Sequence, residues 1–102
     1  MPPKRAVIMH PRDNVATVVE EIKAGEDVAV PLAGTSLTLT AAETIPFGFK
    51  LALQDIPQGD IIRKYGETIG RASTSIAKGT MVHIHNLEGT RARGDLERGG
   101  KR

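Results

Sequence analysis

Apolar residues recur at helical spacing in one segment near the N-terminus, residues 13–25. The residues that share this spacing, at i, i+3, i+4 and i+7, are Val15, Val18, Val19 and Ile22. Such a pattern places side chains on one face of an α-helix. Asp13 or Asn14 can accept the free amide protons of a first turn, and Gly25 can end the helix. The segment therefore predicts one short N-terminal helix, although its β-branched valines also fit an irregular β-rich stretch.

After Gly25 the pattern changes to short runs of β-branched and apolar residues separated by Gly, Pro and Asp. These runs predict strands at residues 28–30, 36–40, 51–53, 61–65, 68–72 and 81–85. Pro31, Pro46 and Pro57 lie between the runs, where a missing amide proton does not disturb pairing. The pattern predicts a small, mainly β domain.

One spacing recurs along the chain: an apolar residue, two residues, Gly, two residues, and a second apolar residue. Its copies are Ile22-Gly25-Val28, Ile56-Gly59-Ile62 and Ile76-Gly79-Val82. Glycine at a constant offset indicates a turn that needs positive φ, held to the core by its two apolar neighbours. Chance is the alternative, because the pattern is loose. The unequal separations argue against a solenoid, whose repeats keep a fixed period.

The composition limits the classes of protein that this sequence can form. The chain has 102 residues, no Cys, no Trp and few aromatic residues, so we expect one small domain with an aliphatic core. Without Cys, disulfides and Cys-ligated zinc are excluded, and a metal would need His and oxygen ligands. Apolar runs are far shorter than the ~18 residues of a membrane span. We expect a cytoplasmic protein that does not bind membranes.

The positive charge lies at the C-terminus. Residues 88–102 contain five basic and three acidic side chains, whereas residues 1–87 contain nine of each. The sequence thus divides into a domain over 1–87 and a basic Gly/Arg-rich tail over 88–102, which we expect to be flexible or ordered only against a partner. A neutral body with so few aromatic residues offers no track for phosphates or bases, so no nucleic-acid partner is expected.

The densest group of chemically active residues is a His-x-His pair followed by Asn86. On a strand, His83 and His85 would point to the same face, roughly 6.6 Å apart, within reach of one metal ion. A third ligand is needed, and His10 is a candidate. The alternative is that both histidines are the polar face of an edge strand.

Two further residues are candidates for a functional role. Lys50 follows a glycine turn at the start of a strand and could bind a substrate carboxylate, although a solvated surface lysine is the simpler interpretation. Tyr65 is more simply explained as a packing residue. The sequence has neither a Gly-x-Ser-x-Gly elbow nor a phosphate-binding glycine loop that opens a helix, which argues against serine hydrolases and nucleotide enzymes.

Several segments together resemble a known family. They are His-Pro-Arg-Asp-Asn-Val-Ala at 10–16, Lys-Leu-Ala-Leu-Gln-Asp-Ile at 50–56, Ile-Arg-Lys-Tyr-Gly-Glu-Thr-Ile-Gly-Arg-Ala at 62–72, and Val-His-Ile-His-Asn-Leu at 82–87. This combination, over residues 6–96, is similar to the SAF domain of the altronate/galactarate dehydratase family. The resemblance implies a compact β-clip fold that is either fused to a large catalytic domain or made as a separate small subunit.

The resemblance also implies a function. The family eliminates water or sulfite from hydroxy acids with a divalent metal such as Fe(II) or Mn(II). We therefore expect the small subunit of a hydro-lyase, inactive without its large catalytic subunit, and the tail would dock to that subunit. His83, His85 and Lys50 would be catalytic, Lys50 and Asn86 would bind the hydroxy-acid substrate, and His83, His85 and His10 would bind the metal.

One residue departs from the family pattern: Phe49 stands where the family usually has His, in Gly48-Phe49-Lys50. This change favours an alternative, a non-catalytic binding or assembly module, because SAF domains also occur in sialic acid synthases and type III antifreeze proteins. A second alternative is the small subunit of a sulfolactate sulfo-lyase. A homo-oligomer is a further possible assembly.

Overall fold

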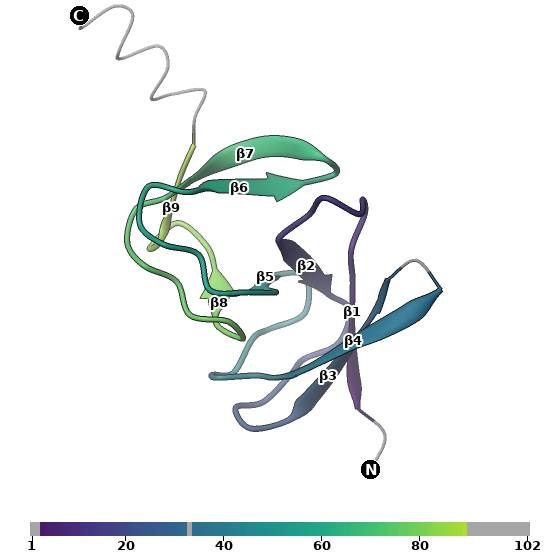
Figure 1. Cartoon of the computed structure of the whole chain (residues 1–102). Helices are drawn as coiled ribbons and strands as arrows, with labels where there is room; N and C mark the ends of the chain where they lie inside the picture. Colours follow the sequence, from purple (N-terminus) through teal and green to yellow (C-terminus); the bar gives the residue numbers. More distant parts are fainter. Residues whose placement is uncertain (1–2, 33, 90–102) are drawn as a thin grey trace, which may run out of the picture.

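The computed structural model describes residues 3–32 and 34–89, which fold into β-strands joined by turns (Figure 1). The strands are β1 (Lys4–Val7), β2 (Val15–Val18), β3 (Asp27–Leu32), β4 (Thr35–Thr40), β5 (Lys50–Ala52), β6 (Ile61–Lys64), β7 (Glu67–Ala72), β8 (Met81–Val82) and β9 (Leu87–Gly89). The prediction of a mainly β domain is confirmed. No helix long and apolar enough to cross a membrane occurs within the described ranges.

The strands form two sheets. A six-stranded sheet has the order β4-β3-β1-β2-β5-β8, and a three-stranded sheet has the order β6-β7-β9. Strands β1 and β3 pair in parallel, and β2 pairs antiparallel with both β1 and β5. The β6–β7 hairpin lies above the middle of the larger sheet (Figure 1).

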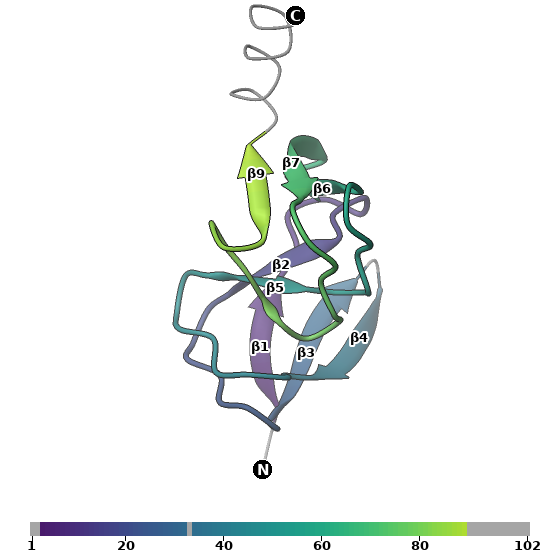
Figure 2. The same ribbon diagram turned by 90° about the vertical axis from the view of Figure 1, so that its left-hand side faces the viewer.

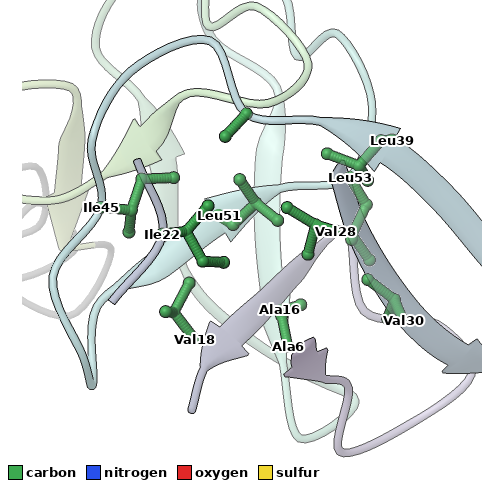
Figure 3. Packing of buried hydrophobic residues seen from close by; sticks show 11 residues of the cluster. Ala6, Ala16, Val18, Ile22, Val28, Val30, Leu39, Ile45, Leu51 and Leu53 are labelled. Atoms are coloured by element: carbon green, nitrogen blue, oxygen red, sulfur yellow. The ribbon is translucent and has the colours of Figure 1, made fainter. Parts of the chain in front are cut away.

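Two hydrophobic clusters share β2, β5 and β8, because alternate residues of these strands face opposite sides. The first cluster, drawn in Figure 3, contains Ala6, Ala16, Val18, Ile22, Val28, Val30, Leu39, Ala41, Ile45, Leu51 and Leu53. The second contains Val15, Ala52, Ile56, Ile62, Ala72, Ile76 and Val82 and lies toward the β6–β7 hairpin. The middle of the larger sheet is therefore buried on both faces.

The recurring glycine turn is confirmed in all of its predicted copies. Gly25, Gly59 and Gly79 have φ of +87°, +90° and +89°, and the apolar residue on each side of every turn is buried. A fourth copy, Ile45-Gly48-Leu51, has the same conformation, with φ of +89° at Gly48. In each copy the residue after Gly donates to the carbonyl three residues back, as Glu26 does to Lys23 at 3.1 Å, which is a type II turn.

The four turns associate in two equivalent pairs. Ile22 and Ile45 exchange backbone hydrogen bonds of 3.0 and 2.7 Å, and Ile56 and Ile76 exchange two of 2.8 Å. Each pair therefore joins two distant chain segments at the base of their turns, one pair in each hydrophobic cluster.

The predicted N-terminal helix over 13–25 is wrong, because residues 15–18 form β2 and the described ranges contain no helix. Val15 faces the second cluster, whereas Ala16 and Val18 face the first. A strand covered on both faces shows a nearly continuous apolar run, and here that run coincided with helical spacing. Ile22 is buried as the anchor of the first glycine turn rather than as part of a helical face.

Two other predictions concern the end of the chain. The strand predicted at 81–85 is too long, because β8 ends at Val82 and residues 84–86 form a turn. Of the predicted tail, Glu88 and Gly89 belong to β9, which pairs with β7, and residues 90–102 lie outside the described residues.

Candidate functional site

Asn86 holds the turn that carries both histidines of the His-x-His pair. Its side-chain Oδ1 accepts the backbone N–H of His83 at 2.9 Å, and its Nδ2 donates to the carbonyl of Met81 at 2.9 Å. Its backbone N–H donates to the His83 carbonyl at 3.0 Å, and its carbonyl accepts the N–H of Ser73 at 3.0 Å. Asn86 is 6% exposed, so these interactions are shielded from water. This arrangement fixes the turn in one conformation.

Strand alternation does not apply to the two histidines, because both follow the last residue of β8. His83 is half-buried, and its ring lies 4.7 Å from the ring of Phe49, centroid to centroid, at a tilt of 59°. His85 is exposed, and Ile84 between them is 81% exposed. One imidazole is thus positioned by an aromatic neighbour, and the other projects into solvent.

Lys50 lies at the start of β5 between two neighbouring strands. It pairs with Thr17 of β2 on one side and with Val82 of β8 on the other. Burial lowers the pKa of the Lys50 ammonium group, and the positive charge of Lys64 lowers it further. Neither lysine forms an ion pair with another described residue. The hydroxyl Oγ1 of Thr17 is buried and has no hydrogen-bond partner within the described part of the chain.

The pairing of Lys50 with Val82 brings the backbones of Lys50 and His83 together, but their side chains begin on opposite faces. Lys50 shares its face of β5 with Ala52, which belongs to the second cluster. Phe49, which contacts His83, packs against the first cluster. The cation and the imidazole therefore stand on two sides of one strand end.

His10 lies in another part of the fold, in the loop between β1 and β2. Its ring packs over Gly66, where an added Cβ would lie 2.8 Å from ring atoms, and its Nδ1 accepts the N–H of Arg12 at 3.1 Å. Gly66 is in the β6–β7 turn, whereas His83 follows β8. Across residues 3–32 and 34–89, no group of three or more His, Asp or Glu side chains is placed to hold a metal ion. The donors described here do not complete a metal site.

Asp13 and Asn14 have roles that the sequence reasoning missed. The Asp13 carboxylate accepts backbone N–H groups of Met9, Tyr65 and Gly66, at 3.1, 3.1 and 2.8 Å. Asn14 donates to the carbonyl of Ile61 at 2.9 Å and accepts the N–H of Arg63 at 2.8 Å, as a strand residue would. The adjacent Asp and Asn residues could have indicated this role, since the side chains of both readily form hydrogen bonds with backbone groups.

These contacts tie the β6–β7 hairpin to the start of β2. The hairpin carries Lys64, whose Nζ lies 5.2 Å from the Tyr65 ring centroid and whose charge acts on Lys50. Two cations with a nearby hydroxyl can bind a carboxylate, and an imidazole can transfer a proton at neutral pH. The arrangement can therefore bind an anion on one side of the strand end and offers an imidazole for acid or base chemistry on the other.

A family model and two curated relatives all relate this chain to the same family. The family model described as the altronate/galactarate dehydratase SAF domain matches residues 4–90. Altronate dehydratase of Bacillus subtilis (strain 168) is 36% identical over 85 residues, which are 83% of this chain and 16% of that protein. Altronate dehydratase of Escherichia coli (strain K12) is 38% identical over 78 residues, 76% of this chain and 15% of that protein.

A shorter relative matches over most of its length. The (2R)-sulfolactate sulfo-lyase subunit alpha of Chromohalobacter salexigens is 33% identical over 85 residues, which are 79% of this chain and 90% of that subunit. The chain thus spans a small part of the dehydratases but nearly all of this subunit. A domain of this kind occurs both within a long enzyme chain and as a named subunit.

Proposed function

Because the chain belongs to the altronate/galactarate dehydratase SAF-domain family, we propose that it is the small subunit of a hydro-lyase that eliminates water from a sugar acid. The observation that carries this proposal is the pairing of Lys50 with Val82, which sets a cation and the imidazole of His83 at the same strand end. The similarity to a sulfo-lyase subunit alpha, which is aligned over 90% of that subunit, supports the subunit role.

The residues of the site fit parts of such a reaction. Elimination next to a carboxylate requires removal of a weakly acidic α-proton and protonation of the departing hydroxyl. In our proposal Lys50, with Lys64 nearby, binds the substrate carboxylate, and one of His83 and His85 protonates the departing hydroxyl. The family resemblance predicts Asn86 as a substrate-binding residue. In our proposal Asn86 instead positions the histidines, since the oxygen and the nitrogen of its side-chain amide both hold the turn.

The large subunit supplies what this chain lacks. A divalent ion such as Fe(II) or Mn(II) would stabilise the negative charge that develops on the carboxylate. The described residues do not by themselves provide a donor set for it, because His10 lies in the loop between β1 and β2, against Gly66, and not beside His83 and His85. We propose that the large subunit provides most ligands of the ion and that His83 or His85 provides no more than one. The large subunit also contributes the general base.

Sulfite elimination is the second candidate, because the relative matched over 90% of its length is named a sulfo-lyase subunit. Sulfonate and carboxylate are both anions that lysine can bind, so the site does not select between them. The choice of substrate distinguishes the two functions directly.

The test is reconstitution with a defined partner. The chain is co-expressed with a partner protein from the same genome. This partner is chosen because it matches the part of Bacillus subtilis altronate dehydratase that is not similar to this chain. The complex is assayed with Fe(II) or Mn(II) on aldonates, aldarates and sulfolactate. We expect turnover of a sugar acid that needs both chains and that falls at least about hundredfold in His83→Ala or Lys50→Ala.

Lys78→Ala is the matched control, because Lys78 is an exposed lysine in a glycine turn remote in sequence from Lys50. It should leave turnover unchanged. Turnover by the large chain alone at the full rate would contradict a catalytic subunit role. Turnover of sulfolactate but of no sugar acid would show that the chain is a subunit of a sulfo-lyase and not of a hydro-lyase.

A further inference from the structure

Two adjacent turns expose large apolar side chains. Ile84 is 81% exposed and Phe47 is 69% exposed, the highest values among the large hydrophobic residues that the structure describes. Ile84 lies in the turn between β8 and β9, and Phe47 lies in the glycine turn that leads into β5. The ring contact between Phe49 and His83, at 4.7 Å, joins the two turns. Figure 2 shows both segments on the same side of the molecule.

Both turns are rigidly held. Asn86 fixes the turn that carries Ile84 through the two hydrogen bonds of its side-chain amide. In the other turn, Gly48 donates to the Val18 carbonyl at 2.8 Å, and the Phe49 carbonyl accepts the N–H of Val18 at 2.9 Å. A turn whose backbone is already fixed loses little further backbone entropy when its apolar side chain binds, which favours the side chain as an interface anchor.

We infer that the turns at 46–49 and 83–86 form the surface that docks onto the large lyase subunit, with Ile84 and Phe47 as its apolar anchors. The inference rests on the proposed function. It identifies where the two chains meet and places the shared active site at the edge of that contact.

The position of the histidines identifies the occupant. His83 and His85 flank Ile84 in the sequence, so a large subunit that presents a substrate to these imidazoles approaches the turn that exposes Ile84. The family occurs both inside long dehydratase chains and as a named subunit, so the same face can serve as the contact with the rest of the enzyme in both arrangements. Burying Phe47 and Ile84 there would also exclude water from the reacting groups.

The experiment measures affinity and assembly in the reconstituted pair. The dissociation constant of the chain for the purified large subunit is determined by calorimetry for wild type, Ile84→Ser and Phe47→Ser. We expect each substitution to weaken binding at least about tenfold. The concentration of chain needed for half-maximal turnover should rise by the same factor.

Met9→Ser is the control, because Met9 is also exposed, at 43%, but lies in the loop between β1 and β2. It should change the dissociation constant less than about twofold. Ile84→Leu keeps an apolar side chain and should restore most of the affinity lost in Ile84→Ser. Since both sites are exposed, thermal unfolding of the free variants should match wild type.

The outcomes separate the two claims. If wild type assembles and turns over substrate but Ile84→Ser and Phe47→Ser bind as well as wild type, the docking surface is wrong and the proposed function stands. If wild type does not bind the large subunit, the proposed function fails, and the docking surface fails with it. Equal weakening by Met9→Ser would also overturn the assignment of this surface.

Discussion

The Asp13 carboxylate accepts the backbone N–H of Gly66 at 2.8 Å, which links two residues separated by 53 positions in the sequence. The same carboxylate accepts the N–H groups of Tyr65 and Met9. Asp13 is 8% exposed, and Tyr65 has a φ of +59°, which is unusual for a residue other than glycine. The carboxylate therefore holds the β6–β7 turn, and with it Lys64, against the rest of the domain.

Asp13→Ala should reduce the free energy of unfolding by about 2 to 3 kcal/mol, because it removes a charged acceptor and leaves three N–H groups without it. Urea denaturation measures the loss. Asp60→Ala is the control, since Asp60 is an exposed acidic residue in a turn. A loss no greater in Asp13→Ala than in Asp60→Ala would contradict the role of Asp13.

Asn86→Ala should reduce the free energy of unfolding by about 2 kcal/mol, because the backbone N–H of His83 and the carbonyl of Met81 lose their partner. NMR relaxation should show increased mobility at His83 and His85. Gln58→Ala, at an exposed turn position, serves as the control. An unchanged His83 signal would show that Asn86 does not position the histidines.

Lys64→Gln should raise the pKa of Lys50 toward its ordinary value of 10.5, because a neighbouring positive charge is removed. The rise should be partial, since burial is the larger cause of the lowered pKa and persists in the variant. NMR titration of the lysine side-chain signals measures this. An unchanged pKa of Lys50 would show that the charge of Lys64 does not act on the Lys50 ammonium group.

Lys50→Met should stabilise the isolated domain slightly at neutral pH. The pKa of Lys50 is lower in the folded state, so its charged form disfavours folding at any pH below that lowered value. The cost shrinks as the pH rises through the lowered pKa toward 10.5, where the unfolded chain also loses its proton. The stability difference from wild type should therefore decrease with rising pH, as measured by denaturation at a series of pH values.

Gly79→Ala should destabilise the domain more than Gly59→Ala. Both glycines have φ near +90°, so both substitutions force an L-residue into the left-handed region, at a cost of about 1 to 2 kcal/mol. An added Cβ at Gly59 meets open space, whereas at Gly79 it would overlap the carbonyl oxygen of Thr40. Equal losses in thermal or urea unfolding would contradict the close approach at Gly79.

The sequence predicted those features of the fold that depend on local conformation. The glycine turns were found because positive φ is a property of a few consecutive residues, and the spacing of their apolar neighbours repeats. The fourth copy, at Ile45, was missed although it obeys the same spacing. The segments that carry the family resemblance lie within residues 4–90, which match the family model.

The candidate site was only partly predictable. Lys50 and His83 were named, but the sequence placed both histidines on a strand, and the turn that holds them depends on the buried side chain of Asn86. The link between Lys50 and Lys64 depends on a hairpin that Asp13 and Asn14 attach to β2 from a distance.

By itself, the sequence determined a small aliphatic β domain, its glycine turns and its family, because these depend on composition, local backbone conformation and motif spacing. Tertiary structure alone decided that residues 15–18 form a strand, since only packing on both faces distinguishes a buried strand from an amphipathic helix. It also decided that His10 and His83 lie in different connections between strands and that Ile84 is exposed, because strand pairing between distant segments sets those positions.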